Sequence, residues 1–173
     1  MPVGNLEFIT SSEVTSSVTS YSLDNIFSAD YDVYQIVLRN FTYTSTATWI
    51  NLRFLDSGGS VISTANYDWA MLNMNAGGAF AEYRGTNATN ITYSGNYTSS
   101  SSQGNTQVLT VYNPFDSGSY TFTNSQDCQF STNIMGNRKI GVLKIAGTHR
   151  GINLDTLNAN AFNTGKISVY GVK

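Results

Sequence analysis

The amino-acid sequence predicts an all-β fold, a single antiparallel β-sandwich of jelly-roll-like type with about ten strands. Three observations predict it: short runs in which apolar and polar residues alternate, turn residues between these runs, and no convincing helical periodicity. The alternation is clearest between Tyr31 and Ser60. One face of the first run holds Tyr34, Ile36 and Leu38, opposite Gln35 and Arg39, and one face of the second holds Ile50, Leu52 and Phe54, opposite Asn51 and Arg53. A period of two is typical of strands with one face in a core and the other in water.

Further strand candidates follow at short, regular spacing along the chain. The full set is Leu6–Ile9, Val14–Leu23, Val33–Thr42, Thr48–Leu55, Val61–Ala65, Ala79–Arg84, Gln107–Tyr112, Ser119–Thr123, Gln129–Ile134, Lys139–Ala146 and Lys166–Val172. Because no helix is expected to cover their faces, these strands must cover one another, which favours two packed sheets.

Turn residues separate many of these candidates. Asp56–Ser60 predicts a hairpin loop, Asn113–Gly118 a turn, and Asn163–Gly165 the approach to the last strand. Gly136 and Asn137 predict a turn between the strands at Gln129–Ile134 and Lys139–Ala146.

Two segments remain ambiguous. Tyr67–Asn73 fits one or two helical turns about as well as an irregular strand or loop. Thr86–Asn105 is rich in Thr, Asn, Ser and Gly, which indicates a long exposed loop or a ragged hairpin.

The length of 173 residues fits one domain, because no linker or change in composition divides it. We expect residues 1–12 to form an N-terminal arm and first strand that serves as a docking segment, and residues 13–173 to form the sandwich. The first ten residues lack the features of a signal peptide, and no apolar run reaches the length of a membrane span. We therefore expect synthesis in the cytoplasm and no membrane insertion.

Composition favours an exposed, polar but weakly charged surface. Charged residues make up 12% of the chain, about half the usual share of roughly 25%. Such surfaces suit extracellular, adhesive or virion proteins. The net charge of −2 gives no basic footprint, so nucleic acid is not an expected partner.

The sequence does not favour an enzyme. The single histidine, His149, is expected to have a structural or surface role, since no GxSxG elbow accompanies it. The acids Asp68, Glu82 and Asp127 are scattered, and no local motif pairs them for glycoside hydrolysis. We therefore expect no catalytic residues and no cofactor. The single cysteine, Cys128, is expected to be a small buried hydrophobe.

The sequence does not predict a metal site either. One Cys and one His are too few for a zinc site. Asp24, Asp30 and Asp32 could offer carboxylates to Ca²⁺, but they lack the spacing of a calcium loop. We expect these three residues to cap loops.

Aromatic residues in polar surroundings give the best binding signal, because rings stack on sugar faces and neighbouring amides and carboxylates bind hydroxyls. The candidate ligand-binding residues are Tyr67, Trp69, Tyr83, Tyr93 and Tyr97. The alternative is that these rings belong to the core or meet a sister subunit. Tyr67 and Trp69 are expected to be the most buried of the set.

Four segments, taken in order, resemble small virion structural proteins of tailed bacteriophages, of which marine and cyanobacterial phages carry many. These segments are Asp32–Asn40 (DVYQIVLRN), Ile50–Gly59 (INLRFLDSGG), Tyr67–Trp69 (YDW) and Thr164–Lys173 (TGKISVYGVK). The resemblance extends from Phe8 to Lys173, although each motif alone is ordinary strand sequence.

The resemblance implies a β-sandwich that coats or projects from a phage particle, commonly as a homotrimer, and it brings no catalytic residues. Its partners would be other capsid or tail proteins. Because no shaft-like segment precedes the first predicted strand, we expect a decorating, cementing or head/tail adaptor subunit on the virion surface. The alternative is the receptor- or carbohydrate-binding tip domain of a tail fibre, with a glycan of the host surface as its ligand.

Overall fold

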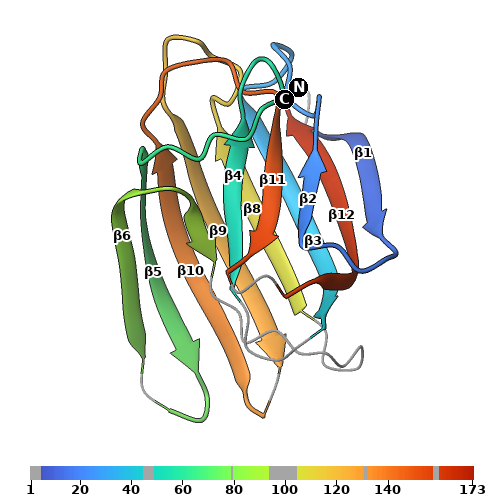
Figure 1. Ribbon diagram of the computed structural model, residues 1–173, viewed down its shortest axis with the longest axis vertical. Helices are drawn as coiled ribbons and strands as arrows, with labels where there is room; N and C mark the ends of the chain where they lie inside the picture. The colour runs from blue at the N-terminus through green and yellow to red at the C-terminus, as the bar shows by residue number, and fades with distance from the viewer. Residues whose placement is uncertain (1–4, 45–48, 79, 94–104, 131, 158–159) are drawn as a thin grey trace.

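A computed structural model describes residues 5–44, 49–78, 80–93, 105–130, 132–157 and 160–173. In these residues the chain forms twelve β-strands in two sheets whose paired strands are all antiparallel (Figure 1). The strands are β1 (Leu6–Val14), β2 (Ser20–Leu23), β3 (Val33–Tyr43), β4 (Ile50–Leu55), β5 (Tyr67–Asn75), β6 (Ala81–Ala88), β7 (Ile91–Tyr93), β8 (Asn105–Tyr112), β9 (Thr121–Phe130), β10 (Ile134–Leu143), β11 (Gly151–Thr156) and β12 (Phe162–Val172). The predicted all-β sandwich is confirmed.

The topology is that of a jelly roll with two inserted hairpins. The larger sheet has the order β1-β12-β3-β8-β9-β10-β5-β6, and the smaller has the order β2-β11-β4-β7. Without β5–β6 and β9–β10, the two sheets read β1-β12-β3-β8 and β2-β11-β4-β7, which is the double four-stranded pattern of a jelly roll. Both hairpins join the larger sheet beyond β8, so they widen that sheet alone.

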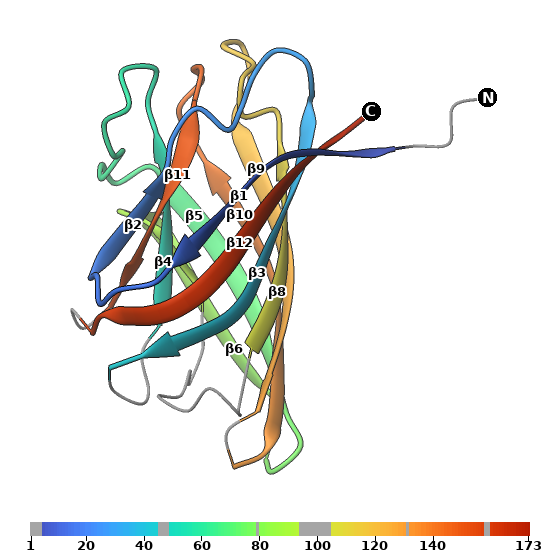
Figure 2. The ribbon, with the colours of Figure 1, turned by 90° about the vertical axis from the view of Figure 1, so that its right-hand side faces the viewer.

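The core lies between the two sheets, which Figure 2 shows as two layers. Tyr34, Ile36 and Leu38 of β3 are buried, as their alternation predicted. From the other sheet, Ile50, Leu52 and Phe54 of β4 pack into the same cluster. Burial of these apolar side chains provides the main driving force for folding.

Two predicted strand boundaries are wrong for a physical reason. The candidates at Ser119–Thr123 and Gln129–Ile134 are parts of one longer hairpin, β9 and β10, and Gly136 and Asn137 lie inside β10 rather than in a turn. A Cβ at Gly136 would lie 2.8 Å from the backbone oxygen of Asp127. The glycine therefore permits close approach of β9, and does not reverse the chain.

The segment Val61–Ala65 is not a strand. It makes only an isolated bridge between Leu55 and Val61. The carboxylate of Asp56 accepts hydrogen bonds from the backbone N–H groups of Gly58 and Ser60, which closes a tight loop directly after β4.

The ambiguous segments are settled where the structure describes them. Tyr67–Asn75 is a strand, so the helical alternative is wrong. Thr86–Asn105 contains the end of β6, the short β7 and the first residue of β8, whereas residues 94–104 lie outside the described part. Most of the expected N-terminal arm is β1, an edge strand paired with β12 from Leu6 to Val14, and residues 1–4 are not described.

Replacing Gly151 with alanine is expected to lower the free energy of unfolding by about 1–3 kcal/mol. A Cβ there would lie 2.1 Å from the backbone oxygen of Leu23, so β2 and β11 must shift apart. Urea denaturation would measure the loss. Gly78→Ala is the matched control, because a Cβ at Gly78 meets no atom within 4 Å. Equal stability of the two variants would contradict the packing described here.

Candidate functional site

A continuous apolar row crosses one face of the eight-stranded sheet. This face is turned away from the four-stranded sheet, and we call it the outer sheet face. Strand pairing places one apolar residue from each of six neighbouring strands in register. The row is Leu6, Val172, Val33, Tyr112, Phe122 and Val142. Phe122 and Leu6 are 46% and 53% exposed, and the other four are half-buried. Water therefore contacts an apolar band that crosses most of the sheet.

The centre of the outer sheet face is uncharged. The outward residues of β3, β8 and β9 next to the row are Gln35, Val37, Val108, Thr110, Asn124 and Gln126. Charged side chains begin only at the borders, with Glu13, Lys166 and Arg39 at one end and Asp68, Glu82, Arg84 and Arg138 near the β6 edge. An exposed apolar patch with a polar rim marks interaction surfaces of proteins.

Strand β9 places its polar and aromatic side chains opposite to the usual arrangement, in which polar side chains face water. Its inward residues are all polar and buried: Thr121, Thr123, Ser125, Asp127 and Gln129. Its outward residues include Phe122 and Phe130, which are about half exposed, and Cys128, which is also exposed. The prediction that Cys128 is buried is wrong, because the register of β9 turns it outward. Exposed aromatic rings on the outward side of a strand are expected where another molecule covers that side.

The inward side of β9 belongs to a buried polar ladder. Asn137 donates to the Asp127 carboxylate at 2.7 Å and accepts from Asn73 at 2.8 Å. Lys139 forms an ion pair with Asp127, and both side chains are at most 2% exposed. Burial lowers the pKa of Lys139, and the neighbouring carboxylate of Asp127 raises it and so opposes this effect. The ladder ties β9, β10 and β5 together beneath the outer sheet face.

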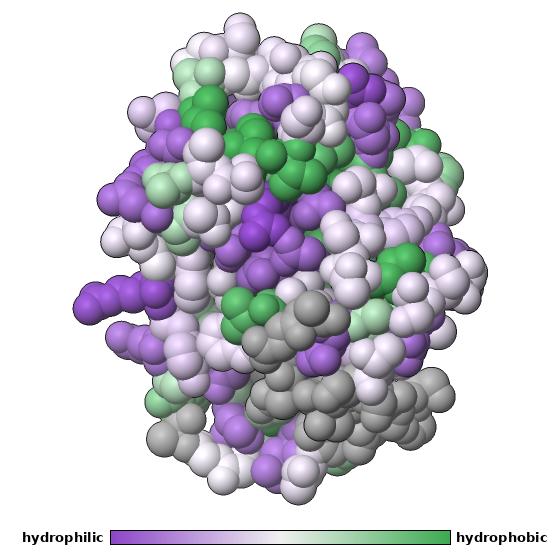
Figure 3. All heavy atoms as spheres, viewed as in Figure 1, coloured by the Kyte–Doolittle hydropathy of each residue, from purple (hydrophilic) through white to green (hydrophobic). Residues whose placement is uncertain are grey.

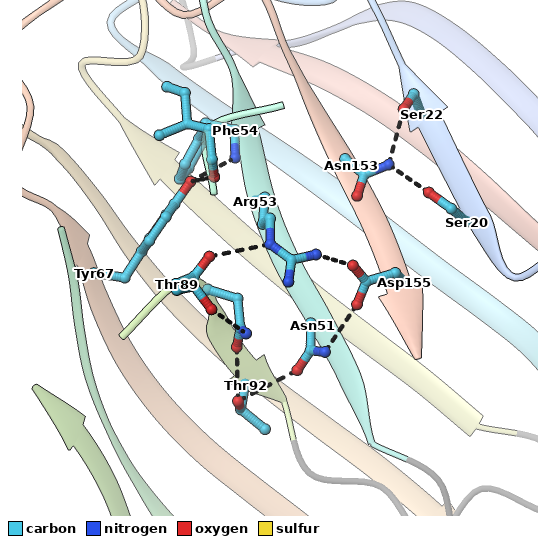
Figure 4. A network of polar contacts seen from close by, with 12 residues as sticks. Ser20, Ser22, Asn51, Arg53, Phe54, Tyr67, Thr89, Thr92, Asn153 and Asp155 are labelled. Carbon is cyan, nitrogen blue, oxygen red and sulfur yellow. Dashed lines mark hydrogen bonds and ion pairs between the residues drawn. The ribbon is translucent and has the colours of Figure 1, made fainter. Parts of the chain in front are cut away.

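The opposite face of the molecule has a polar centre (Figure 3). Figure 3 shows hydrophilic side chains at the centre of the four-stranded sheet. Figure 4 shows how they connect: Asp155 forms an ion pair with Arg53 and accepts from Asn51 at 2.8 Å. Arg53 also donates to the Thr89 carbonyl at 3.0 Å, and Thr92 donates to Asn51 at 3.3 Å.

A second part of this polar face joins β11 to β2. The amide nitrogen of Asn153 donates to Ser20 at 2.8 Å and to Ser22 at 2.9 Å. These groups satisfy one another across β2, β11, β4 and β7, so the network stabilises the sheet.

One residue of the predicted aromatic set, Tyr67, lies in the core. Tyr67 is fully buried, and its hydroxyl accepts from Phe54 N at 3.1 Å and donates to Ile62 O at 2.9 Å. Burial raises its pKa to about 12. Its ring therefore offers no face to a sugar in this fold.

The other members of the set differ in exposure. Trp69 is half-buried and lies against the position of a Cβ at Gly85. Tyr83 is 40% exposed and meets Trp49 edge-on at 5.3 Å. Tyr93 lies in β7 with a side chain outside the described set, and Tyr97 lies outside the described residues altogether.

His149 is a buried, hydrogen-bonded residue of the fold. It is 1% exposed, and its Nδ1 lies 2.9 Å from the Thr121 hydroxyl. Burial lowers its pKa, which favours the neutral ring.

Asp24 pairs with Arg150, and Asp30 accepts from the Ser28 hydroxyl at 3.0 Å.

Neither a metal site nor a membrane-spanning helix is found among the described residues. No group of three or more His, Cys, Asp or Glu side chains is placed to hold a metal ion. No helix there is long and apolar enough to cross a membrane.

The sequence pattern did not predict the outer sheet face. The available signal was the segment Thr121–Phe130, where one alternating set is wholly polar and the other contains both aromatic residues, Phe122 and Phe130. Dividing this segment between two predicted strands concealed the alternation.

Replacing Asp127 with asparagine is expected to destabilise the protein by about 3–5 kcal/mol, because Lys139 would keep a buried charge without its carboxylate. Chemical denaturation would measure the change. The double variant Asp127→Asn/Lys139→Met is the matched control and should recover most of the lost stability. If the double variant is no more stable than the single one, the ion pair is not the cause.

Tyr67→Phe is expected to cost about 1–3 kcal/mol, because it removes the hydroxyl partner of the buried Phe54 N–H and of the partly buried Ile62 carbonyl. Its effect also depends on pH. The neutral phenol is favoured in the folded state, so this stabilisation is complete below the ordinary pKa of 10.0 and is lost as the pH rises to about 12. Ultraviolet titration and denaturation would test both effects. The control Tyr83→Phe should change stability little, and a similar loss in both variants would contradict the assignment.

Comparisons with known proteins identify no family. Neither a protein-family model nor a curated protein sequence matches the chain. Among solved structures, the CBM2 module of the evolved Dit of Lactobacillus casei BL23 phage J-1 has a TM-score of 0.26 and 9% identity, covering 100% of this chain and 81% of that one. The structure of infectious bursal disease virus strain Gt has a TM-score of 0.16 and 7% identity, covering 98% and 38%. Similarity this low supports no argument about function.

Proposed function

We propose that the protein is a non-enzymatic structural subunit of a bacteriophage virion, which decorates or cements the particle surface through protein–protein contacts. The observation that carries the proposal is the outer sheet face, with its apolar row across six strands and its uncharged centre. The sequence resemblance suggests the virion, and the geometry suggests the mode of attachment.

The size of the outer sheet face suits a protein interface. Six strands at a spacing of ~4.8 Å span about 24 Å, and three rows of side chains cover about 20 Å along the strands. The resulting area is on the order of 500 Å², compared with ~800 Å² per partner in a standard interface. The flanking residues of β5 and β6 can supply the remainder.

The two faces of the sandwich suggest an orientation on the particle. The outer face of the four-stranded sheet holds a self-satisfied polar network, which suits contact with water. The outer sheet face would then contact other capsid or tail proteins. A homotrimer on the virion surface, made in the host cytoplasm, is part of the same proposal and derives from the resemblance.

A second candidate function is a receptor- or carbohydrate-binding tip domain of a tail fibre. The observation that favours it is the exposed ring of Tyr83, held edge-on to Trp49. A tip domain would be present in few copies and would bind host cells through these rings. A decorating subunit would be present in many copies and would need the outer sheet face instead.

The double substitution Phe122→Glu/Ile140→Glu is expected to abolish incorporation into phage particles while the domain stays folded. Both side chains are exposed, at 46% and 61%, so their replacement affects a docked partner more than the core. Quantitative mass spectrometry of purified particles would measure copies per particle. Circular dichroism of the isolated variant would confirm the fold.

Val61→Glu is the matched control, since Val61 is 41% exposed and lies in the β4–β5 connection, away from the outer sheet face. It should leave incorporation unchanged. Normal incorporation of the double variant would overturn the proposed attachment. Loss of host-cell binding on Tyr83→Ala, with incorporation intact and few copies per particle, would favour the fibre-tip function.

A further inference from the structure

The outer sheet face is hollowed over β9, β10, β5 and β6. Two adjoining hollows of about 660 and 540 Å³ share the lining residues Ala70, Arg84 and Ile140. We call them together the hairpin groove, because the two inserted hairpins, seen on the left in Figure 1, form it. The jelly-roll strands contribute no lining residue to it.

The register explains the hollow. Ile140, Ala70 and Arg84 face each other on β10, β5 and β6. The methyl group of Ala70 therefore lies between two long side chains. Ala70 is itself exposed, so the floor of the groove is open to the outside.

The groove has an apolar end and a charged end. Phe122 and Val142 join Ile140 at the apolar end. At the other end, Arg138 and Glu82 join Arg84. A ligand that spans the groove would thus meet an apolar surface first and guanidinium groups next.

The charged end has an excess of positive charge. Among the described residues, neither Arg84 nor Arg138 has an ion-pair partner. The nearby Asp68 is already used, since it pairs with Lys144 at 2.9 Å and accepts from the backbone of Asn87 at 2.7 Å. Lys139 also lines the groove, but its buried charge is already paired with Asp127. Two guanidinium groups thus face one carboxylate, Glu82.

We propose that the hairpin groove binds an extended segment of a partner virion protein that presents an apolar side chain and a carboxylate on the same side. The inference rests on the proposed function and names the chemistry of the partner at one part of the outer sheet face. The backbones at Ile140 and Arg84 lie two strand spacings apart, about 10 Å. In an extended segment, residues i and i+2 point the same way about 7 Å apart, and the long arginine side chain covers the difference.

The test is titration of ¹⁵N-labelled protein with the blocked peptide Ser-Thr-Phe-Thr-Glu-Thr-Ser, followed by NMR. We expect saturable shifts confined to the amides around Ala70, Arg84 and Ile140. Replacing Glu with Lys in the peptide, or Phe with Ser, should weaken binding by about tenfold or more, because each change removes one of the two contacts.

Variants of the protein test the same contacts from the other side. Arg84→Glu should weaken binding of the Glu peptide and strengthen that of the Lys peptide. Ala70→Leu should weaken both, because it fills the floor of the groove. Lys166→Glu is the matched charge reversal on the same face, four strands away from β10, and should change neither.

Absence of saturable shifts, equal binding of all three peptides, or shifts outside the groove would each overturn the inference. Particle incorporation separates this result from the proposed function. If the protein is abundant in virions and Phe122→Glu/Ile140→Glu removes it, but the peptides do not bind, then the inference fails and the proposed function stands. If the peptides bind but the protein is absent from virions, the proposed function fails and the partner lies elsewhere.

Discussion

The pairing register of β9 with β10 is the constraint on which the rest of the structure depends. Because successive side chains of a strand point to opposite faces, a slip of one residue would bring Phe122 inside and turn Asp127 outward. The ion pair between Asp127 and Lys139 opposes such a slip, since either charge left unpaired inside would be strongly destabilising. The close approach of the two backbones at Gly136 adds a steric requirement for the same register. The buried polar ladder thus fixes the composition of the outer sheet face.

Most of the jelly-roll core could be predicted from the sequence, whereas the candidate site could not. Strands such as β3 and β4 follow the ordinary rule of apolar residues inside and polar residues outside, so Tyr34 to Leu38 and Ile50 to Phe54 identify their own faces. Strand β9 reverses the rule, and for that reason its boundaries and the exposure of Cys128 were predicted wrongly. The apolar row joins residues as distant in sequence as Leu6 and Val142, and only the pairing of six strands brings them into register.

The two inserted hairpins give the fold a division of roles. The eight jelly-roll strands supply most of the apolar core, to which β5 and β10 add Tyr67 and Leu143. The four-stranded sheet presents a polar network to the outside. The two hairpins, β5–β6 and β9–β10, widen only the larger sheet. They therefore add outer surface and a polar inner ladder. Insertions of this kind can change what a surface recognises while the core that stabilises the domain stays the same.

In the proposed function, the apolar row and the hairpin groove contribute different properties to docking. Apolar burial is strong but has no direction, so a flat row alone would hold a partner in several registers. Charged groups at the border contribute orientation and selectivity more than affinity. Arg84 and Arg138 lie at one end of the outer sheet face, beside Ala70, and not throughout it. A partner with a single acidic group next to an apolar side chain can then satisfy both contacts in one register only, which turns an adhesive surface into a specific one.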